Sequence, residues 1–181
     1  MKKAISRIRG WLVHIAKVFR LQGSNRDPDQ RDVWIEQDFW FLVREYGFHY
    51  GGYFEGHTDF ISERVRVRIV PSRKTPYSFI YRVGEPDFTA LDLFGVLEHF
   101  ESKPLNIDFT EHSLQHNLKF LAVLVNRHAN RICNEVDEWW LPLQQARFNA
   151  LRKEYEKENR LPLFLESYKD WHQYLKHKGA I

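Results

Sequence analysis

Hydrophobic residues recur along the chain with two different periods, and the change of period predicts a helix, a group of strands and then further helices. Residues 32–46 have apolar side chains at the spacing of one helical face. Gly47 follows directly and predicts a helix end, because glycine readily adopts the left-handed conformation. The apolar positions of this first helix are Ile35, Phe39, Leu42 and Tyr46.

Residues 48–83 predict two or three antiparallel strands joined by short turns. A strand over 48–54 is interrupted at Gly51 and Gly52, which indicates a bulge or turn. A second strand covers 60–70, a turn follows at 71–76, and a third strand covers 77–83. In the second strand, Val65, Val67 and Ile69 alternate with Arg64, Arg66 and Arg68.

Period-two alternation assigns each strand a core face and an outer face. Val65, Val67 and Ile69 are predicted to face the helices, and the three arginines to face solvent or a protein partner. On the third strand the large apolar side chains are predicted to point into the core, with Arg82 on the outer face beside the arginines. These apolar residues are Tyr77, Phe79, Tyr81 and Val83.

After residue 88 the period becomes helical again. One helix is predicted to begin at Asp87 or Thr89 and to end at 102–104; it carries Leu91, Phe94, Leu97 and Phe100. A second is capped by Thr110, a third has Pro142 in its first turn, and a last one contains Phe164, Tyr168, Trp171 and Leu175. The predicted fold class is α+β: a small antiparallel β-meander of two to four strands packed against several helices.

The N-terminal segment is basic and amphipathic. Its apolar residues share one helical stripe, so it is predicted to form a helix that docks on the protein's own core, on an anionic membrane surface or in a partner's groove. Residues 1–26 are therefore interpreted as a basic arm with a linker, and residues 27–181 as a single domain. The candidate membrane- or partner-binding residues of the arm are Lys2, Lys3, Arg7, Arg9, Trp11 and Lys17.

Composition and charge narrow the class of protein. The chain has 181 residues, 43% of them hydrophobic, which is enough for a sizeable core. Its one cysteine, Cys133, excludes an internal disulfide and favours a cytoplasmic location, and no apolar run or signal peptide predicts a membrane span or secretion. Residues 1–26 hold seven basic and no acidic side chains, so the rest of the chain, with 20 basic and 24 acidic groups, is mildly acidic.

Residues that carry catalytic chemistry are sparse. His112 and His116 are four residues apart beside Glu111, a spacing found in metal sites, but no third ligand can be named and exposed helix histidines are the preferred interpretation. Cys133 is expected to be a core residue. Phosphate-binding glycine loops and nucleophile motifs are absent from the sequence. A non-enzymatic protein without cofactor or metal is therefore expected, with an enzyme whose site is not recognisable as an alternative.

The arginine strand raises the question of nucleic-acid binding. Sheets that bind RNA present aromatic side chains beside basic ones on the exposed face, because bases need a stacking platform. Since the aromatic residues of the next strand are predicted to point inward, the outer face is expected to be basic without being aromatic. A solvated or protein-binding face is therefore preferred, and nucleic-acid binding is not expected.

The order of the predicted elements resembles that of small bacterial immunity proteins of polymorphic and contact-dependent toxin systems. The resemblance covers about residues 32–131 and rests on the segment 41–48, the strand around 65–69, the strand around 78–80 and the helices after residue 91. It implies that the protein binds and neutralises one cognate toxin and has no catalytic residues. The alternative is an accessory protein that binds nucleic acid or a membrane surface through the arm and Arg64, Arg66 and Arg68.

A protein partner would contact aromatic anchors flanked by charges. The segment 134–140 has this composition, and an acidic surface would complement the basic cleft of a nuclease toxin. Its tryptophans have a second interpretation, in which they seal the junction of two helices. With the arginines of the strand, the candidate partner-binding residues in this segment are Glu135, Asp137, Glu138, Trp139 and Trp140.

Overall fold

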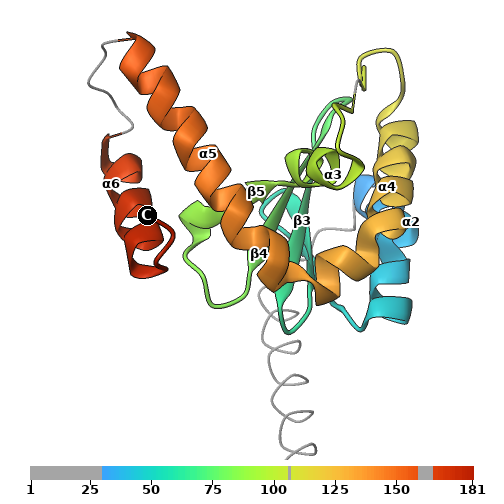
Figure 1. The fold of residues 1–181 in the computed structure, drawn as a ribbon. Helices are drawn as coiled ribbons and strands as arrows, with labels where there is room; N and C mark the ends of the chain where they lie inside the picture. The colour runs from blue at the N-terminus through green and yellow to red at the C-terminus, as the bar shows by residue number, and fades with distance from the viewer. Residues whose placement is uncertain (1–29, 106, 159–164) are drawn as a thin grey trace, which may run out of the picture.

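The computed structural model describes residues 30–105, 107–158 and 165–181. The candidate residues of the N-terminal arm, Lys2 to Lys17, lie outside these residues. Helices and strands follow one another in the predicted order (Figure 1). The elements are α2 (Gln30–Tyr46), β1 (His49–Phe54), β2 (His57–Ile61), β3 (Val65–Pro71), β4 (Pro76–Arg82), a 3₁₀ helix η1 (Asp87–Thr89), β5 (Leu91–Asp92), α3 (Leu93–Glu101), α4 (Leu114–Asn134), α5 (Val136–Glu158) and α6 (Leu165–His177).

The strands form one five-stranded antiparallel sheet in the order β1-β2-β3-β4-β5. The α+β class is confirmed, and the sheet has one strand more than the largest number predicted. The predicted strand over 60–70 is in fact two strands, because Ser62 closes a tight turn by accepting hydrogen bonds from the backbone N–H groups of Arg64 and Val65. Leu91 was predicted in a helix and lies in β5 instead, a strand too short to leave a periodic pattern.

The link between α2 and β1 follows the prediction. Gly47 ends the helix with a φ of 70°, and the Phe48 N–H donates back to the Leu42 carbonyl across this turn. β1 then pairs with β2, with a register shift between Tyr50 and Tyr53 that forms the predicted bulge around the two glycines. This geometry brings the C-terminal end of α2 close to the start of the sheet.

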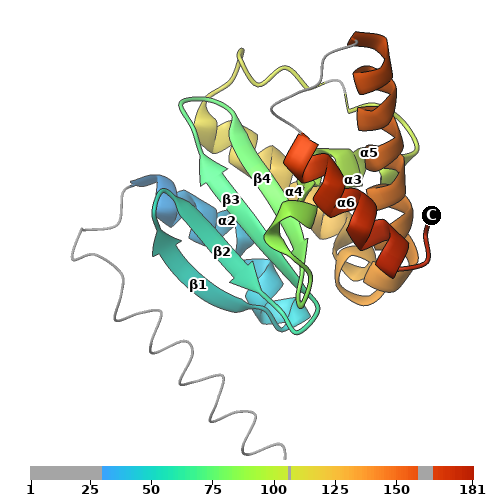
Figure 2. The same ribbon diagram turned by 90° about the vertical axis from the view of Figure 1, so that its left-hand side faces the viewer.

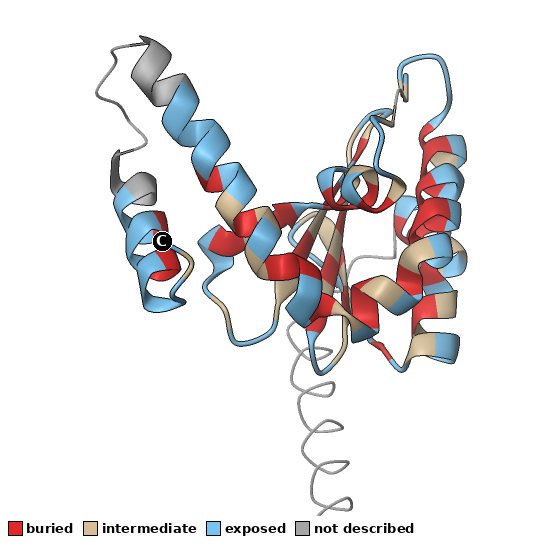
Figure 3. Ribbon diagram, in the orientation of Figure 1, coloured by how far each residue is buried: buried red, intermediate tan, exposed pale blue. Residues whose placement is uncertain are grey.

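Among the described residues, helices cover only one face of the sheet. α2 and α4 pack side by side on this face, and α3 lies across its end (Figures 1 and 2). Val65, Val67 and Ile69 are fully buried beneath them, as predicted, together with Phe60 and Ile80 from the neighbouring strands. Buried residues are concentrated between the sheet and these helices (Figure 3). We call this side of the sheet the covered face and the other side the open face.

A second, smaller apolar cluster joins α5 to α6. It consists of Phe148, Trp171, Tyr174 and Leu175, so the predicted inward positions Trp171 and Leu175 of the last helix are confirmed. The prediction for Pro142 was wrong. α5 begins at Val136, one residue after α4 is completed, and Pro142 therefore lies inside the helix rather than in its first turn.

The helix starts also differ from the prediction. Asp92 caps α3 by accepting a hydrogen bond from the Gly95 N–H, so neither Asp87 nor Thr89 begins this helix. Ser113 caps α4 by accepting from the His116 N–H, whereas the hydroxyl of Thr110 donates to Asp108. In both cases the residue directly before the helix outcompetes a capping residue farther upstream. None of the described helices combines the length and apolar composition needed to cross a membrane.

Candidate interaction surface

The open face is the largest described part of the sheet that no helix covers, and Figure 2 shows it toward the viewer. Three of its strands contribute alternating side chains. Because antiparallel residues that pair directly point to the same side, the register assigns one row of residues from each strand to this face. These residues are His57, Asp59 and Ile61 from β2, Arg66, Arg68 and Val70 from β3, and Tyr77, Phe79 and Tyr81 from β4.

This register corrects the predicted orientation of β4. Tyr81 pairs with Arg66, and Phe79 pairs with Arg68, so the aromatic side chains share the open face with the arginines. Ser78 and Ile80 are the residues of β4 that are buried on the covered face. The open face is thus both basic and aromatic, contrary to the prediction. Tyr77 is the most exposed of these rings, with 55% of its surface accessible.

Arg68 and Asp59 form the central ion pair of the open face. The guanidinium donates from Nε and Nη2 to the two carboxylate oxygens, at 2.8 and 2.9 Å. This two-point contact has a fixed geometry, and the hydrogen bonds to Asp59 raise the pKa of Arg68 further above its ordinary value. The side chains are only 24% and 15% exposed, so each charge depends on the other for compensation.

His57 lies beside this pair, with its Nε2 atom 3.8 Å from Asp59. Burial lowers the pKa of His57, and the positive charge of Arg68 lowers it further, against a smaller opposing effect of Asp59. The ring also contacts Phe54 edge-on, at 6.2 Å between ring centroids. The histidine is therefore held in its neutral form near pH 7 and acts as a packing residue of the open face.

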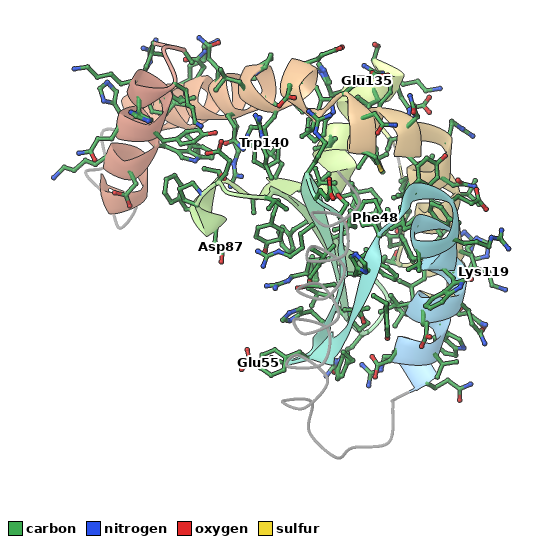
Figure 4. All side chains as sticks on the ribbon, turned by 90° about the horizontal axis from the view of Figure 1, so that it is seen from below. Phe48, Glu55, Asp87, Lys119, Glu135 and Trp140 are labelled. Atoms are coloured by element: carbon green, nitrogen blue, oxygen red, sulfur yellow. The ribbon has the colours of Figure 1, made fainter. Side chains whose placement is uncertain are left out.

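Arg66 has a different environment from Arg68. Its guanidinium carbon lies 3.9 Å from the centre of the Tyr81 ring, a cation–π contact. Nη2 donates to the Asp87 carboxylate at 2.9 Å, and the Asp87 side chain is 84% exposed. Asp87 projects from η1 at the edge of the molecule (Figure 4). The half-buried Arg66 is thus compensated by a carboxylate of η1 that water reaches freely.

Arg64 does not belong to the same row. It lies in the turn between β2 and β3, and its Nη1 donates to the Asn134 carbonyl at the end of α4, at 2.6 Å. Its Nη2 donates to Asp137, which also accepts a hydrogen bond from Arg82. The predicted continuous row of three arginines is therefore wrong: Arg64 and Arg82 attach the start of α5 to the sheet, and only Arg66 and Arg68 lie on the open face.

The two tryptophans predicted as partner anchors are buried. Trp139 is 3% exposed and Trp140 is fully buried. The Trp139 indole donates to the Arg131 carbonyl at 2.9 Å, and the Trp140 indole donates to the Tyr174 hydroxyl at 3.2 Å. They seal the junction of α4, α5 and α6, which is the second interpretation of the sequence, and a partner cannot contact them at this surface.

The acidic residues of the same segment do remain accessible. Glu138 is exposed, and Asp137 is 54% exposed although it binds two arginines. Glu135 lies at the end of α4, where it pairs with Arg131 at 3.5 Å. Asp137 and Glu135 are thus compensated by Arg64, Arg82 and Arg131, and Glu138 is the acidic residue of this segment that has no ion pair among the described residues.

The residues considered for catalysis are not assembled into a site. His112 precedes α4 rather than lying on it, and its ring is 4.4 Å from that of His116, with both residues exposed. Burial raises the pKa of Cys133 to about 12, which leaves almost no thiolate at neutral pH. Within the described residues, no group of three or more His, Cys, Asp or Glu side chains is arranged to hold a metal ion.

The charges of the open face cancel within the face itself. Arg68 is paired with Asp59 and Arg66 with Asp87, so the two cations leave no excess positive charge for a row of phosphates. What the face offers instead is accessible aromatic surface around ordered, oriented charges. This composition is typical of the central part of protein–protein interfaces.

Comparisons of the chain with protein-family models, with curated proteins and with solved structures found no match.

Proposed function

We propose that the protein acts by binding another protein, as an immunity protein that neutralises a cognate bacterial toxin, and that the open face is its binding surface. The observation that supports this most is the composition of the open face, in which Arg68 is held by an ion pair and Arg66 and Tyr81 by a cation–π contact. Tyrosine and arginine are the residues that most often dominate binding energy at protein interfaces. The proposed site of action is the cytoplasm, where the single cysteine would stay reduced.

The proposed mechanism is steric and stoichiometric. Because Arg66 and Arg68 are already oriented by Tyr81 and Asp59, few side chains lose freedom when a partner binds, which favours tight association. Two further features favour binding over catalysis: the raised pKa of Cys133 and the open, solvent-facing position of His112 and His116. The proposal involves no cofactor.

The proposal can be tested by co-expressing the chain with any protein from the neighbouring genes that stops growth when it is expressed alone. We expect the chain to restore growth and to form a one-to-one complex in size-exclusion chromatography. Tyr77→Ala should weaken the complex at least tenfold, because Tyr77 is exposed at the open face. The matched control is Val123→Ala on α4, which removes a 60% exposed apolar side chain from the other layer and should have no effect. Equal binding by both variants would contradict the choice of surface.

A second experiment tests whether neutralisation needs catalysis. The triple variant His112→Ala, His116→Ala and Cys133→Ala should still neutralise the toxin if binding is sufficient. Because Cys133 is 7% exposed, folding of the variant has to be checked by circular dichroism. A folded triple variant that binds the toxin and fails to protect would show that chemistry is required.

Single-stranded nucleic acid is the second candidate ligand. It is favoured by one observation, that Tyr77, Phe79 and Tyr81 share the open face with Arg66 and Arg68. Against it, the guanidinium of Arg66 covers the Tyr81 ring, and both arginines are neutralised by aspartates. We expect no binding of a 20-nucleotide single-stranded RNA in fluorescence anisotropy at physiological salt. Micromolar, salt-sensitive binding that is lost in an Arg66→Gln, Arg68→Gln variant would favour nucleic acid instead.

A further inference from the structure

A cavity of about 300 Å³ lies at the end of the sheet, away from the centre of the open face. It is enclosed by the C-terminal end of α2, the start of β1, the turn between β2 and β3, and the last residues of α4. The lining combines apolar surface with a few polar groups. The lining residues with side chains that bear on its chemistry are Tyr46, His49, Ile61, Glu63, Arg64, Cys133 and Asn134.

The electrostatics of this cavity favour a positively charged ligand. Two helices, α2 and α4, direct their C-terminal ends toward it, since Tyr46 and Asn134 are the last residues of these helices and both line the cavity. Helix C-termini carry partial negative charge on their unpaired carbonyl groups. One cation already binds at such a helix end: the Arg64 guanidinium donates to the Asn134 carbonyl at 2.6 Å.

The two charged side chains of the wall are not equivalent. Arg64 is engaged by both Asn134 and Asp137, so its charge is compensated. Glu63 is exposed and has no hydrogen bond or ion pair within the described part of the chain. The charge that remains available to a ligand at the mouth is therefore a carboxylate, and an anionic ligand would have to approach it directly.

We propose that this cavity accepts a lysine or arginine side chain of a protein partner. The apolar wall formed by Ile61, Tyr46 and Cys133 would pack against the methylene groups of such a side chain, while Glu63 and the helix ends would bind its charged head. The inference rests on the proposed function in one respect, namely that the partner is a protein.

The charge preference can be measured with short peptides as probes. We expect acetyl-Gly-Lys-Gly-amide and acetyl-Gly-Arg-Gly-amide to shift the amide NMR signals of Gly47, Ile61 and Cys133, with at least fivefold higher affinity than acetyl-Gly-Glu-Gly-amide. Glu63→Gln should lower the affinity for the basic peptides severalfold. Glu111→Gln is the matched control, because it lies before α4 and is separated from the cavity by the length of that helix, about 30 Å. Equal affinity for the acidic and basic peptides would overturn the inference.

The single cysteine gives an independent readout, since it lines the cavity. A cationic methanethiosulfonate reagent should modify Cys133 faster than an anionic one, after each rate is divided by the rate with free cysteine. Glu63→Gln should reduce this ratio toward one, whatever the intrinsic reactivity of the thiol. A ratio of one in the unchanged protein would show that the cavity does not select cations.

A third probe distinguishes a side chain of a protein from a free polyamine as the cation that binds. Micromolar binding of spermidine without detectable binding of the basic tripeptides would identify a free polyamine as the ligand and overturn the protein version of the inference. A failure of the peptide preference leaves the proposed function standing, because the open face would still be its binding surface. Conversely, a cation-selective cavity in a chain that protects against no toxin would remove the proposed function alone.

Discussion

Residues of the covered face and of the open face alternate along the same strands, yet different interactions stabilise the two faces. On the covered face, Val67 and Ile69 are fully buried under α2 and α4, where apolar burial supplies the free energy. On the open face, the same strand presents Arg66 and Arg68, which are compensated by aspartates and by an aromatic ring. The first face determines whether the chain folds.

The second face keeps charged and aromatic groups in fixed positions, and none of the described helices packs over them. Water competes with such contacts, so their net contribution to stability is smaller than that of core packing. The difference between the faces therefore separates residues needed for folding from residues available for binding. It also ranks the following variants by their expected effect on the free energy of unfolding.

The largest effect is expected from a pair of neighbours on β3. Ile69→Ala removes a fully buried side chain on the covered face and should lower the free energy of unfolding by about 2–5 kcal/mol. Val70→Ala, one residue later on the open face, should cost less than about 1 kcal/mol because Val70 is only half-buried. Urea denaturation measures both. Similar losses in the two variants would show that something covers the open face.

The ion pair at the centre of the open face should have the next largest effect. A double-mutant cycle with Arg68→Met and Asp59→Asn is expected to give a coupling energy of about 1–3 kcal/mol, because both side chains are mostly buried and bonded at two points. The pair Arg44–Glu45 on α2, with 73% and 44% exposure, is the control and should couple by less than about 0.5 kcal/mol. A coupling near zero for the first pair would mean that water screens it fully.

The two faces were not equally predictable from the sequence. The face assignment of β3 is unambiguous, because alternating valines and arginines leave only one row that can be buried. On β4 both rows contain large apolar residues, and the row with more aromatic surface, Phe79 and Tyr81, was assigned to the core. The register excludes this, since a four-residue loop between the paired Pro71 and Pro76 places even-numbered residues of β3 opposite odd-numbered residues of β4. That loop length was visible in the sequence and would have identified the correct row.

The ion-pair partners of the charged residues could not be predicted from the sequence. The ion pairs of Arg64 with Asp137 and of Arg66 with Asp87 join residues 73 and 21 positions apart. Such pairs are set by how the chain returns on itself, and nothing in local periodicity encodes them. The burial of Trp139 and Trp140 had the same origin, since Trp139 packs against Phe100 of α3 and Trp140 donates a hydrogen bond to Tyr174 of α6.

A pH-dependent effect is expected from His57. Its pKa in the folded protein is lowered by burial and by Arg68, so the unfolded chain binds a proton at this residue more readily than the folded chain. Stability should therefore fall as the pH decreases through the ordinary histidine pKa of about 6.5 toward the lower folded value. His57→Gln should reduce the stability loss between about pH 7.5 and 5.5. His112→Gln, which replaces an exposed histidine outside the sheet, serves as the matched control.

The smallest effect is expected at the edge of the open face, from Asp87→Asn. This substitution removes the charge that Arg66 contacts at 2.9 Å, but Asp87 is 84% exposed, and water can replace its carboxylate. Arg66 also retains its contact with the Tyr81 ring. The free energy of unfolding should therefore change by less than about 0.5 kcal/mol, in contrast to Asp59→Asn, which leaves the mostly buried Arg68 without its partner. A loss above about 1.5 kcal/mol for Asp87→Asn would mean that Arg66 depends on this loop as Arg68 depends on β2. The two arginines would then be equally important for stability, and neither would be free to change its contacts when a partner binds the open face.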